Sequence, residues 1–479
     1  MEARTITPTG EQIAITDLIR SDTCNVIVNA LAGTGKTTTL EMIQDASPTR
    51  PVLLICFNKR VADDATKRFP STTTVRTFNS LGHRIWAKSV SKLTLDPQKT
   101  ATIFKAIRDE LPKPYRSEAS ELYWDVISAV AKAKALGYVP ESKFPQARRL
   151  ITAEELYASL DEKPSSLLAE LIDAVLITSI KAAYAGSIDY NDQIFMPALF
   201  GGTFSRFPLV LVDEAQDLNP TNHAMLDKLC KSSRICAVGD PWQSIYGFRG
   251  AVQNGMSQLA ATWHMHEKTI SISFRCPQAI VENVRWRVPH FRWVKEGGHV
   301  EQLSGLEPNN IPDGATILCR NNAPLFRCAF HLLAERRSVA VSGSEIGPKL
   351  IGILRKIGSD ADTQADLLTK IEGWRDEKLQ KSQAPATIND MADCLRIFAS
   401  FGATMAQAVA YAEHLFAQRG AIKMMTGHKA KGGEWDQVYH LDPWLIGDDE
   451  QELNLRYVIS TRAKEALYEI DSQNIRWLA

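Results

Sequence analysis

The sequence predicts an α/β protein with two parallel-sheet domains, each of which carries a helical insertion. Short apolar, β-branched runs alternate with helical segments from about residue 24 to residue 80, a pattern typical of a parallel sheet. Long amphipathic helices then dominate residues 85–200, and apolar strand patterns return near residue 209. A second alternating set begins after about residue 265 and is interrupted by helical segments at 351–418.

The order of these patterns indicates that each insertion separates the early strands of a sheet from its late strands. No repeat of 20–50 residues and no low-complexity tract is present. The predicted parts are 1–84 and 201–265 for the first sheet domain, 85–200 for its insertion, 266–350 and 419–479 for the second sheet domain, and 351–418 for its short insertion.

Composition narrows the class of protein. Lys and Arg total 55, as do Asp and Glu, so the net charge of zero implies no overall attraction to nucleic acid, although it allows a local basic groove. The eight cysteines form no C-x-x-C pair, which favours reduced thiols over a zinc site or a disulfide framework. We find no signal-peptide pattern and no apolar run near the roughly 18 residues of a membrane span, so we expect a cytoplasmic protein without a membrane partner.

Residues 29–40 read NALAGTGKTTTL and join a β-branched run to a helical segment. Such a turn is an anion site, because unpaired backbone N–H groups converge at the start of the helix. The stretch nearly matches the phosphate-binding pattern G-x-x-x-x-G-K-[ST], with Ala30 in place of the first glycine. In this interpretation Lys36 lies over the β- and γ-phosphates and the Thr37 hydroxyl holds Mg²⁺. A plain strand-to-helix turn is the alternative for this stretch alone.

The stretch LVLVDEAQD, residues 209–217, places paired acids directly after four apolar residues. Open α/β sheets bind their ligands at the carboxyl ends of strands, where these carboxylates would lie. Asp213 would orient Mg²⁺ through its water shell, and Glu214 would position and activate an attacking water. The alternative is a strand followed by a helix that Asp213 caps.

Together, AGTGKT and DEAQD resemble the UvrD/Rep-like group of superfamily 1 helicases. Further motifs occur in the order found in that family: TPTGEQIAI, TFNSLG, VGDPWQSIYGFRGA, ISFRCP, TGHKAKGGEWDQV and LNLRYVISTRAK. Three positions depart from the usual pattern, with Asn79 in place of His, Phe274 in place of Tyr and Phe248 in place of Trp. The sequence looks most similar to the branch that contains the F-box DNA helicases and compact phage or bacterial relatives.

The resemblance implies two RecA-like domains, designated 1A and 2A, with insertions 1B and 2B, and ATP bound with Mg²⁺ at their interface. Gln12 would read the adenine edge, Phe274 would stack on the adenine and Glu434 would accept from the ribose. The implied catalytic residues are Lys36, Glu214, Gln243, Arg275 and Arg462, and the implied metal ligands are Thr37 and Asp213. The implied nucleotide contacts are Gln12, Ala32, Gly33, Thr34, Gly35, Lys36, Thr37, Thr38, Phe274 and Glu434.

For nucleic acid, the resemblance implies contacts with single-stranded DNA and with junctions between single and double strands. Aromatic rings stack on bases of any sequence, so Tyr246, Phe248 and Phe78 are candidates, with core packing as the alternative for Phe78. The full set of implied DNA contacts is Asn58, Phe78, Asn79, Tyr246, Phe248, Thr426 and His428.

The expected activity is that of an ATP-dependent 3′-5′ DNA helicase or translocase, the direction being implied by the resemblance alone. The alternative is a DNA-dependent ATPase that acts as a switch or recruiting module without productive unwinding. A kinase or small-molecule NTPase would leave the later motifs without a purpose. Asp189 and Asp192, in SIDYNDQIFMP, are read as capping groups at a helix start rather than as catalytic carboxylates.

Overall fold

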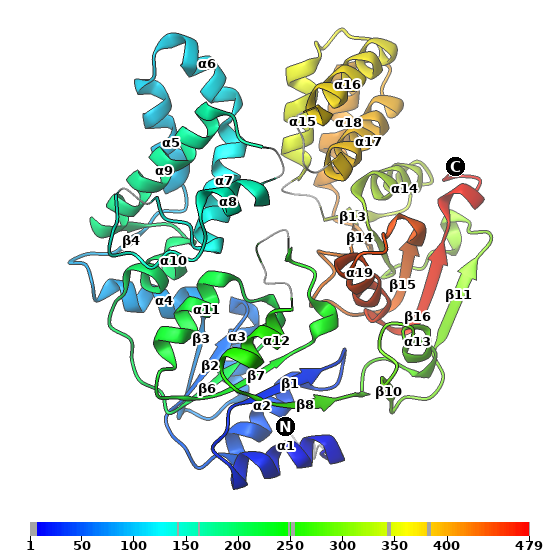
Figure 1. Ribbon diagram of the computed structural model, residues 1–479. Helices are drawn as coiled ribbons and strands as arrows, with labels where there is room; N and C mark the ends of the chain where they lie inside the picture. Colours follow the sequence, from blue (N-terminus) through cyan, green and yellow to red (C-terminus); the bar gives the residue numbers. More distant parts are fainter. Residues whose placement is uncertain are drawn as a thin grey trace. The chain divides into compact units, whose positions relative to one another are not determined.

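The computed structural model describes residues 7–140, 143–160, 163–247, 250, 254–342, 346–380 and 385–478. The chain divides into two compact units, an N-terminal unit, Met1–Ser271, and a C-terminal unit, Ile272–Ala479. Each unit contains a parallel six-stranded sheet and a group of helices (Figure 1). The predicted α/β fold class with two parallel sheets is therefore confirmed.

The sheet of the N-terminal unit has the strand order β3-β2-β6-β7-β1-β8, and all its pairs are parallel. Its inner strands are continuous apolar runs, because helices cover both of their faces. The strands are β1 (Val26–Ala30), β2 (Val52–Cys56), β3 (Thr73–Thr77), β6 (Leu209–Val212), β7 (Arg234–Gly239) and β8 (His266–Ile270).

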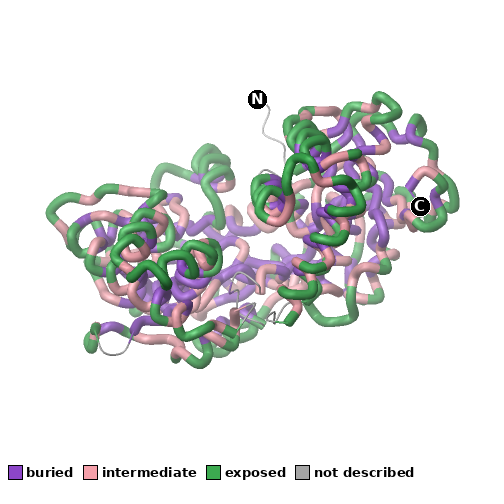
Figure 2. The backbone as a smooth tube through the Cα atoms, turned by 90° about the horizontal axis from the view of Figure 1, so that it is seen from above, coloured by how far each residue is buried: buried purple, intermediate pink, exposed green. Residues whose placement is uncertain are grey.

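Two apolar clusters hold this sheet between its helices, one on each face. On one face α1 (Gly10–Ser21), α2 (Lys36–Ala46) and α3 (Lys59–Arg68) pack against alternate strand residues. Buried residues line the interior of the unit, and the outer turns of its helices are exposed (Figure 2). The opposite face is covered by α4 (Phe78–Ala87), α11 (Pro220–Leu229) and α12 (Gly255–Thr262).

The strand His266–Ile270 corrects one expectation. The sequence analysis assigns it to the second sheet domain, but β8 pairs with β1 at the edge of the first sheet, with Ala30 opposite Ile270. Alternation along the chain identifies a strand but cannot say which sheet it joins, because pairing is decided by tertiary contacts. Two predicted boundaries, 84/85 and 350/351, also fall inside helices, α4 and α15 (Ile346–Ile357).

The helices between β3 and β6 share the apolar cluster that covers one face of the first sheet. A buried ionic network links them: Lys99 Nζ lies 2.6 Å from Asp192, and Lys134 Nζ lies 2.7 Å from both Asp189 and Asp192. Each of these two carboxylates also accepts the backbone N–H of the other residue. The N-cap of the helix that begins at Asp192 is Asn191, with no side-chain cap bond, so the capping interpretation stays a prediction. The helices are α5 (Lys99–Glu110), α6 (Lys113–Glu121), α7 (Tyr123–Leu136), α8 (Ala153–Ser159), α9 (Ser166–Tyr184) and α10 (Asp192–Phe200).

The C-terminal unit has a second parallel sheet, with the strand order β11-β16-β15-β12-β14-β13. Its strands are β11 (His299–Leu303), β12 (Thr316–Cys319), β13 (Val339–Val341), β14 (Ile422–Thr426), β15 (Trp435–Leu441) and β16 (Ala463–Ile470). The helices described in this unit are α13 (Gln278–Asn283), α14 (Asn322–Ala334), α15, α16 (Gln364–Leu379), α17 (Pro385–Phe401), α18 (Met405–Ala417) and α19 (Glu450–Ser460).

None of the described helices in either unit is long and apolar enough to cross a membrane.

One buried side chain in the second sheet predicts a pH effect on stability. His440 of β15 is fully buried, and among the described residues neither of its ring nitrogens has a hydrogen-bond partner. Burial, with a smaller contribution from Arg456, lowers the pKa of His440 to about 3. Unfolding exposes the ring and restores a pKa near 6.5, so the unfolded chain binds one proton more than the folded chain between these two pH values.

Folded stability should therefore fall as the pH drops below about 6.5, by roughly 1.4 kcal/mol per pH unit from this group. The His440→Leu variant lacks that proton and should lose about 2 kcal/mol less than the parental chain between pH 6.5 and pH 5. Urea unfolding at the two pH values measures the difference. Equal losses in the two proteins would show that His440 does not titrate on unfolding.

Candidate functional site

The turn between β1 and α2 has the geometry of a phosphate-binding loop. Gly33 and Gly35 adopt φ of 71° and 83°, a left-handed conformation that other residues rarely take. Gly35 is also the N-cap of α2, so the N–H groups of the first turn of that helix remain available to an anion. Ala30, which departs from the usual glycine, is the last residue of β1 and is paired in the sheet. An alanine is compatible with this extended position.

Two carboxylates lie at the same edge of the sheet as this turn, just after β6. Lys36 Nζ lies 3.4 Å from Glu214 Oε1, so the structure brings the turn and the acidic pair together. Burial, with a further contribution from Glu214, raises the pKa of Asp213 to about 7, and Lys36 partly opposes the rise. Glu214 itself has φ of 52°, a strained value for a residue with a side chain.

These residues fit a magnesium ion. Mg²⁺ prefers oxygen ligands and is usually held by one or two carboxylates together with substrate phosphates. Asp213 and the hydroxyl of Thr37, the second residue of α2, supply such oxygens.

A hydrogen-bonded chain runs from the acidic pair to the segment after β7. Gln216 Nε2 donates to Glu214 Oε2 over 2.6 Å, and Gln216 Oε1 accepts the N–H of Asp240 over 3.0 Å. Asp240 then accepts from Gln243 Nε2 over 2.7 Å. A Cβ atom at Gly239 would lie only 2.4 Å from Gln216 Oε1, so the chain of bonds needs a glycine there. Glu214 and Gln243 are thereby connected through two intermediates.

Asp240 is a member of this chain that the sequence analysis missed. It is fully buried, and burial raises the pKa of its carboxyl, with Lys36 as the main opposing charge. The signal was present, because Asp240 follows the apolar strand β7 as Asp213 follows β6.

Gln12 lies beside the phosphate-binding turn, in the first turn of α1. Its Nε2 donates to Thr39 Oγ1 of α2 over 3.1 Å, and its Oε1 accepts the N–H of Thr9 over 3.0 Å. A Cβ atom at Gly35 would lie 3.7 Å from Gln12 Nε2. Both ends of the Gln12 amide therefore form hydrogen bonds with other protein groups. The role of Gln12 in adenine recognition stays a prediction.

The remaining predicted contacts of the turn differ in exposure. Ala32 and Thr34 are buried, and the Thr34 hydroxyl donates to the carbonyl of Leu31 over 2.8 Å. Gly33, Gly35, Lys36, Thr37 and Thr38 are half-buried.

Three of the predicted site residues, Arg275, Glu434 and Arg462, belong to one cluster in the C-terminal unit. Arg275 Nε lies 2.6 Å from Glu434 Oε2, an ion pair that the sequence analysis did not foresee. Arg462 is only 2 % exposed and donates to the carbonyls of Val458, over 3.0 Å, and Gly433, over 3.2 Å. Because Gly433 precedes Glu434, both arginines belong to one charged cluster.

Phe274, beside this cluster in the chain, is 44 % exposed. Its ring is therefore accessible, as stacking on a base would require. Thr426, at the end of β14, is buried, and His428 is half-buried. The structure thus places these two candidates at a strand end, where their DNA contacts stay predictions.

Two aromatic rings of the N-terminal unit face each other. The rings of Phe57 and Tyr246 are nearly parallel, with an interplanar angle of 4° and centroids 6.3 Å apart. Phe57 directly follows β2 and is 44 % exposed. The sequence analysis named Tyr246 but missed Phe57, because only the folded chain brings the two rings together.

Phe78 corrects an expectation, and Phe248 lies outside the described residues. Phe78 is 7 % exposed and belongs to the apolar cluster under α4, so its ring cannot stack on a base. The alternative of core packing is therefore correct for this residue. The side-chain amides of the two asparagines predicted to contact DNA form hydrogen bonds within the protein. Asn58 Oδ1 accepts from Val61 N–H over 3.0 Å, and Asn79 Nδ2 donates to the carbonyl of Tyr190 over 2.7 Å.

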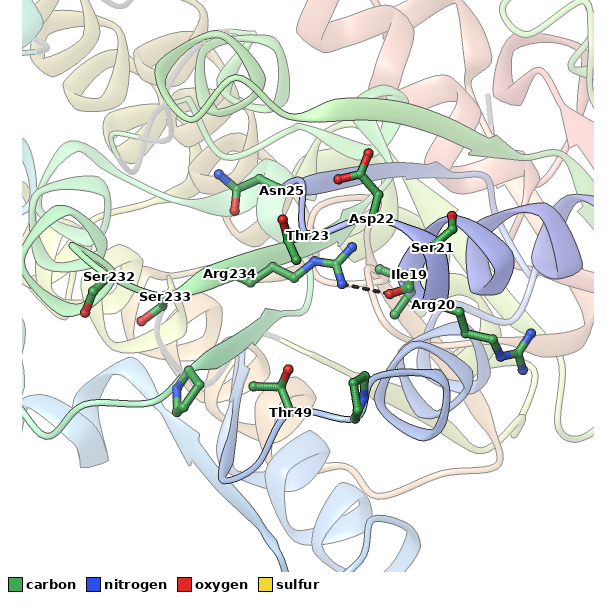
Figure 3. Close-up of a pocket in the computed structure, with 12 residues that line it drawn as sticks. Ile19, Arg20, Ser21, Asp22, Thr23, Asn25, Thr49, Ser232, Ser233 and Arg234 are labelled. Atoms are coloured by element: carbon green, nitrogen blue, oxygen red, sulfur yellow. Dashed lines mark hydrogen bonds between the residues drawn. The ribbon is translucent and has the colours of Figure 1, made fainter.

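A cavity of about 520 Å³ lies at the opposite edge of the first sheet, where β1, β6 and β7 begin. Arg234 occupies its centre and donates to the carbonyl of Ile19 over 2.9 Å (Figure 3). None of the predicted site residues lines this cavity. The phosphate-binding turn and this cavity are therefore separate features of the N-terminal unit.

Comparison with known proteins gives consistent matches. A sequence model described as the UvrD/REP helicase N-terminal domain matches residues 14–264. The chain is 25 % identical to F-box DNA helicase protein 1 of Schizosaccharomyces pombe, with 92 % of this chain and 55 % of that protein covered. It is 26 % identical to F-box DNA helicase 1 of Gallus gallus, with 92 % and 47 % covered. For DNA helicase IV of Escherichia coli K12 the identity is 27 %, with 51 % and 41 % covered.

The chain spans about half the length of the curated relatives that it matches. The family match covers more than half of the chain, including the phosphate-binding turn, the acidic pair and the segment after β7. The resemblance seen in the motifs is therefore confirmed, and the chain belongs to the UvrD/REP helicase family.

Proposed function

We propose that the chain is an ATP-driven motor that moves 3′ to 5′ on single-stranded DNA and separates strands at junctions with a duplex. The observation that carries the proposal is the connected site of the N-terminal unit, in which Lys36, Glu214 and Gln243 belong to one network. The three relatives described above are each named as DNA helicases, which supports DNA as the substrate.

In this proposal the N–H groups at the start of α2 and the Lys36 ammonium hold the phosphates of ATP. Thr37 and Asp213 would hold Mg²⁺, which neutralises phosphate charge when it is bound. Glu214 Oε1 lies near Lys36, where it can orient a water toward the γ-phosphate and accept its proton. Gln243 would then report the state of the nucleotide through Asp240.

The C-terminal unit would contribute two further cations, Arg275 and Arg462, to the charge that develops on the transferred phosphoryl group. Phe274 would stack on the adenine, and Glu434, which pairs with Arg275, would accept from the ribose. We also propose that the two units correspond to the RecA-like domains 1A and 2A with their insertions 1B and 2B.

DNA would bind beside the same network. The parallel faces of Phe57 and Tyr246 suit base stacking, which does not depend on sequence. Tyr246 lies three residues after Gln243, so one short segment can touch both the nucleotide site and a base. This continuity supports a coupling between ATP hydrolysis and movement along the strand.

The proposal is tested with purified protein alone, by ATP hydrolysis with and without single-stranded DNA and by unwinding of a forked duplex. We expect DNA to stimulate hydrolysis, and we expect ATP to be required for strand separation. Stimulated hydrolysis without any unwinding would favour the alternative, a DNA-dependent switch or recruiting module. Absence of hydrolysis under both conditions would contradict both functions.

A further inference from the structure

A stretch of the N-terminal unit, residues 65–95, carries positive charge without an acid of its own. It contains six lysine and arginine residues and no Asp or Glu, although the two signs balance over the whole chain. Lys67 and Arg68, at the end of α3, pair with Asp64 and Glu41. The other four cations form no ion pair with a carboxylate in the part of the chain that the structure describes: Arg76, Arg84, Lys88 and Lys92.

Arg76 lies on β3, the outermost strand of the first sheet, on the face that α4 covers. Val75 belongs to the apolar cluster on the opposite face, and successive residues of a strand point to opposite faces. Arg76 Nη1 donates to the carbonyl of Val75 over 2.8 Å. Its Nε is buried and has no hydrogen-bond partner among the described residues. The guanidinium of Arg76 therefore keeps unused donors at the edge of the sheet.

Two further cations continue from Arg76 along α4. Ser80 Oγ accepts the N–H of Thr77 and donates to its carbonyl, each over 3.1 Å, so Ser80 lies on the side of α4 next to β3. Arg84 and Lys88 follow Ser80 by one and two helical turns on that side, and both are exposed. Burial, with a further contribution from Arg84, lowers the pKa of Arg76, which agrees with two guanidinium groups in the same region. We call Arg76, Arg84 and Lys88 the cationic row.

The cationic row suits a chain of phosphates. Like charges that lie together without acids repel each other, and bound anions relieve that repulsion. Guanidinium groups match the geometry of phosphate oxygens. One helical turn, about 5.4 Å, separates the backbone positions of Arg84 and Lys88, so the charges are presented in succession rather than around one point. A polyanion therefore fits the row better than a single small anion.

The row begins beside the proposed DNA site of the same unit. Cys56 of β2 is opposite Thr77 of β3, and Phe57 follows Cys56. Arg76, which precedes Thr77, is therefore one strand away from the segment that carries the Phe57 ring. A nucleic-acid strand that stacks a base on Phe57 has its next phosphates within reach of this edge of the sheet.

We propose that the cationic row binds successive phosphates of the single strand whose base stacks on Phe57, and so guides that strand along the outer edge of the first sheet. The inference rests on the proposed function, which supplies single-stranded DNA as the ligand. Phosphate contacts carry no sequence information, so the row adds affinity for any sequence and fixes the path of the strand.

The test uses the full chain and measures the Kd of a fluorescent oligothymidine at several salt concentrations. Each phosphate contact with a single strand contributes about 0.7 to the slope of log affinity against log salt concentration. Arg76→Gln/Arg84→Gln should therefore reduce the steepness of that slope by about 1.4, and Arg84→Gln or Lys88→Gln alone by about 0.7. The two single variants change exposed side chains, so they test the row even if the double variant does not fold.

A second oligomer keeps the phosphates but replaces the thymidines with abasic residues. Arg76→Gln/Arg84→Gln should weaken the binding of both oligomers by the same factor, because the row contacts phosphates alone. Phe57→Ala should weaken only the binding of oligothymidine, because stacking needs a base. A double variant that loses affinity for oligothymidine but not for the abasic oligomer would overturn the inference.

The matched control is Arg20→Gln, which removes an exposed arginine that pairs with Asp17 and lines the cavity at the opposite edge of the sheet. It should leave the slope unchanged. An equal reduction in Arg20→Gln, or a parental slope in both single variants, would overturn the inference while leaving the proposed function intact. A parental chain that binds neither oligomer at low salt would overturn the proposed function, and the inference with it.

Discussion

Replacing Glu214 with glutamine should lower ATP turnover by at least about 100-fold, because an amide cannot accept the proton of the attacking water. Glutamine keeps the size of the side chain, so ATP should still bind with nearly the parental Kd. Lys36→Ala should lose turnover to a similar degree, because it removes a charge that the site presents to the phosphates. Turnover and nucleotide binding are measured on the same preparations.

Arg462→Ala extends this prediction to the C-terminal unit and should also lower turnover by at least about 100-fold. Because the guanidinium is buried and bonded to backbone carbonyls, thermal melting is needed to separate misfolding from lost chemistry. Parental turnover in Glu214→Gln would show that the base is assigned wrongly.

The second large effect concerns the facing aromatic rings. Base–aromatic stacking contributes about 1–3 kcal/mol per base, so Phe57→Ala should weaken binding of single-stranded DNA by roughly 5- to 150-fold. Tyr246→Ala should act in the same direction. Hydrolysis without DNA should stay close to parental in Phe57→Ala, because that ring lies outside the network that joins Lys36 to Gln243.

Tyr115→Ala is the matched control for this prediction. Tyr115 lies on α6 and is exposed, so its loss removes a surface aromatic without touching the facing pair. Binding of a fluorescent oligothymidine to the variants gives the comparison. A Phe57→Ala protein with parental DNA affinity, or equal weakening by Tyr115→Ala, would refute stacking at this pair.

The strands were predictable where a buried run made the pattern unambiguous. Leu209–Val212 is apolar throughout because helices cover both faces of the sheet. His266–Ile270 lies at the edge, and its mixed, partly exposed residues carry no mark of the sheet that it joins. Sequence pattern identified both strands, but the partner of the edge strand depended on tertiary contacts with β1.

The site residues likewise differ in whether local sequence or tertiary contacts determine their positions. The positions of Lys36 and Glu214 at the site could be predicted from local motifs. Each residue lies in a short segment after a strand, so its position depends mainly on its neighbours in the sequence. The sequence could not decide between stacking and core packing for Phe78, because its burial depends on the cluster beneath α4. Phe57 was missed because its partner ring lies far along the chain. The Arg275–Glu434 ion pair likewise joins segments distant in sequence.

Strand displacement from tailed duplexes tests the central claim most directly. The substrates carry either a 3′ or a 5′ single-stranded tail and are mixed with the purified chain, with Lys36→Ala as the inactive reference. The proposed function predicts ATP-dependent displacement from the 3′-tailed duplex, little from the 5′-tailed duplex and none by Lys36→Ala. Displacement from neither substrate, while DNA still stimulates ATP hydrolysis, would contradict the claim that this chain unwinds DNA.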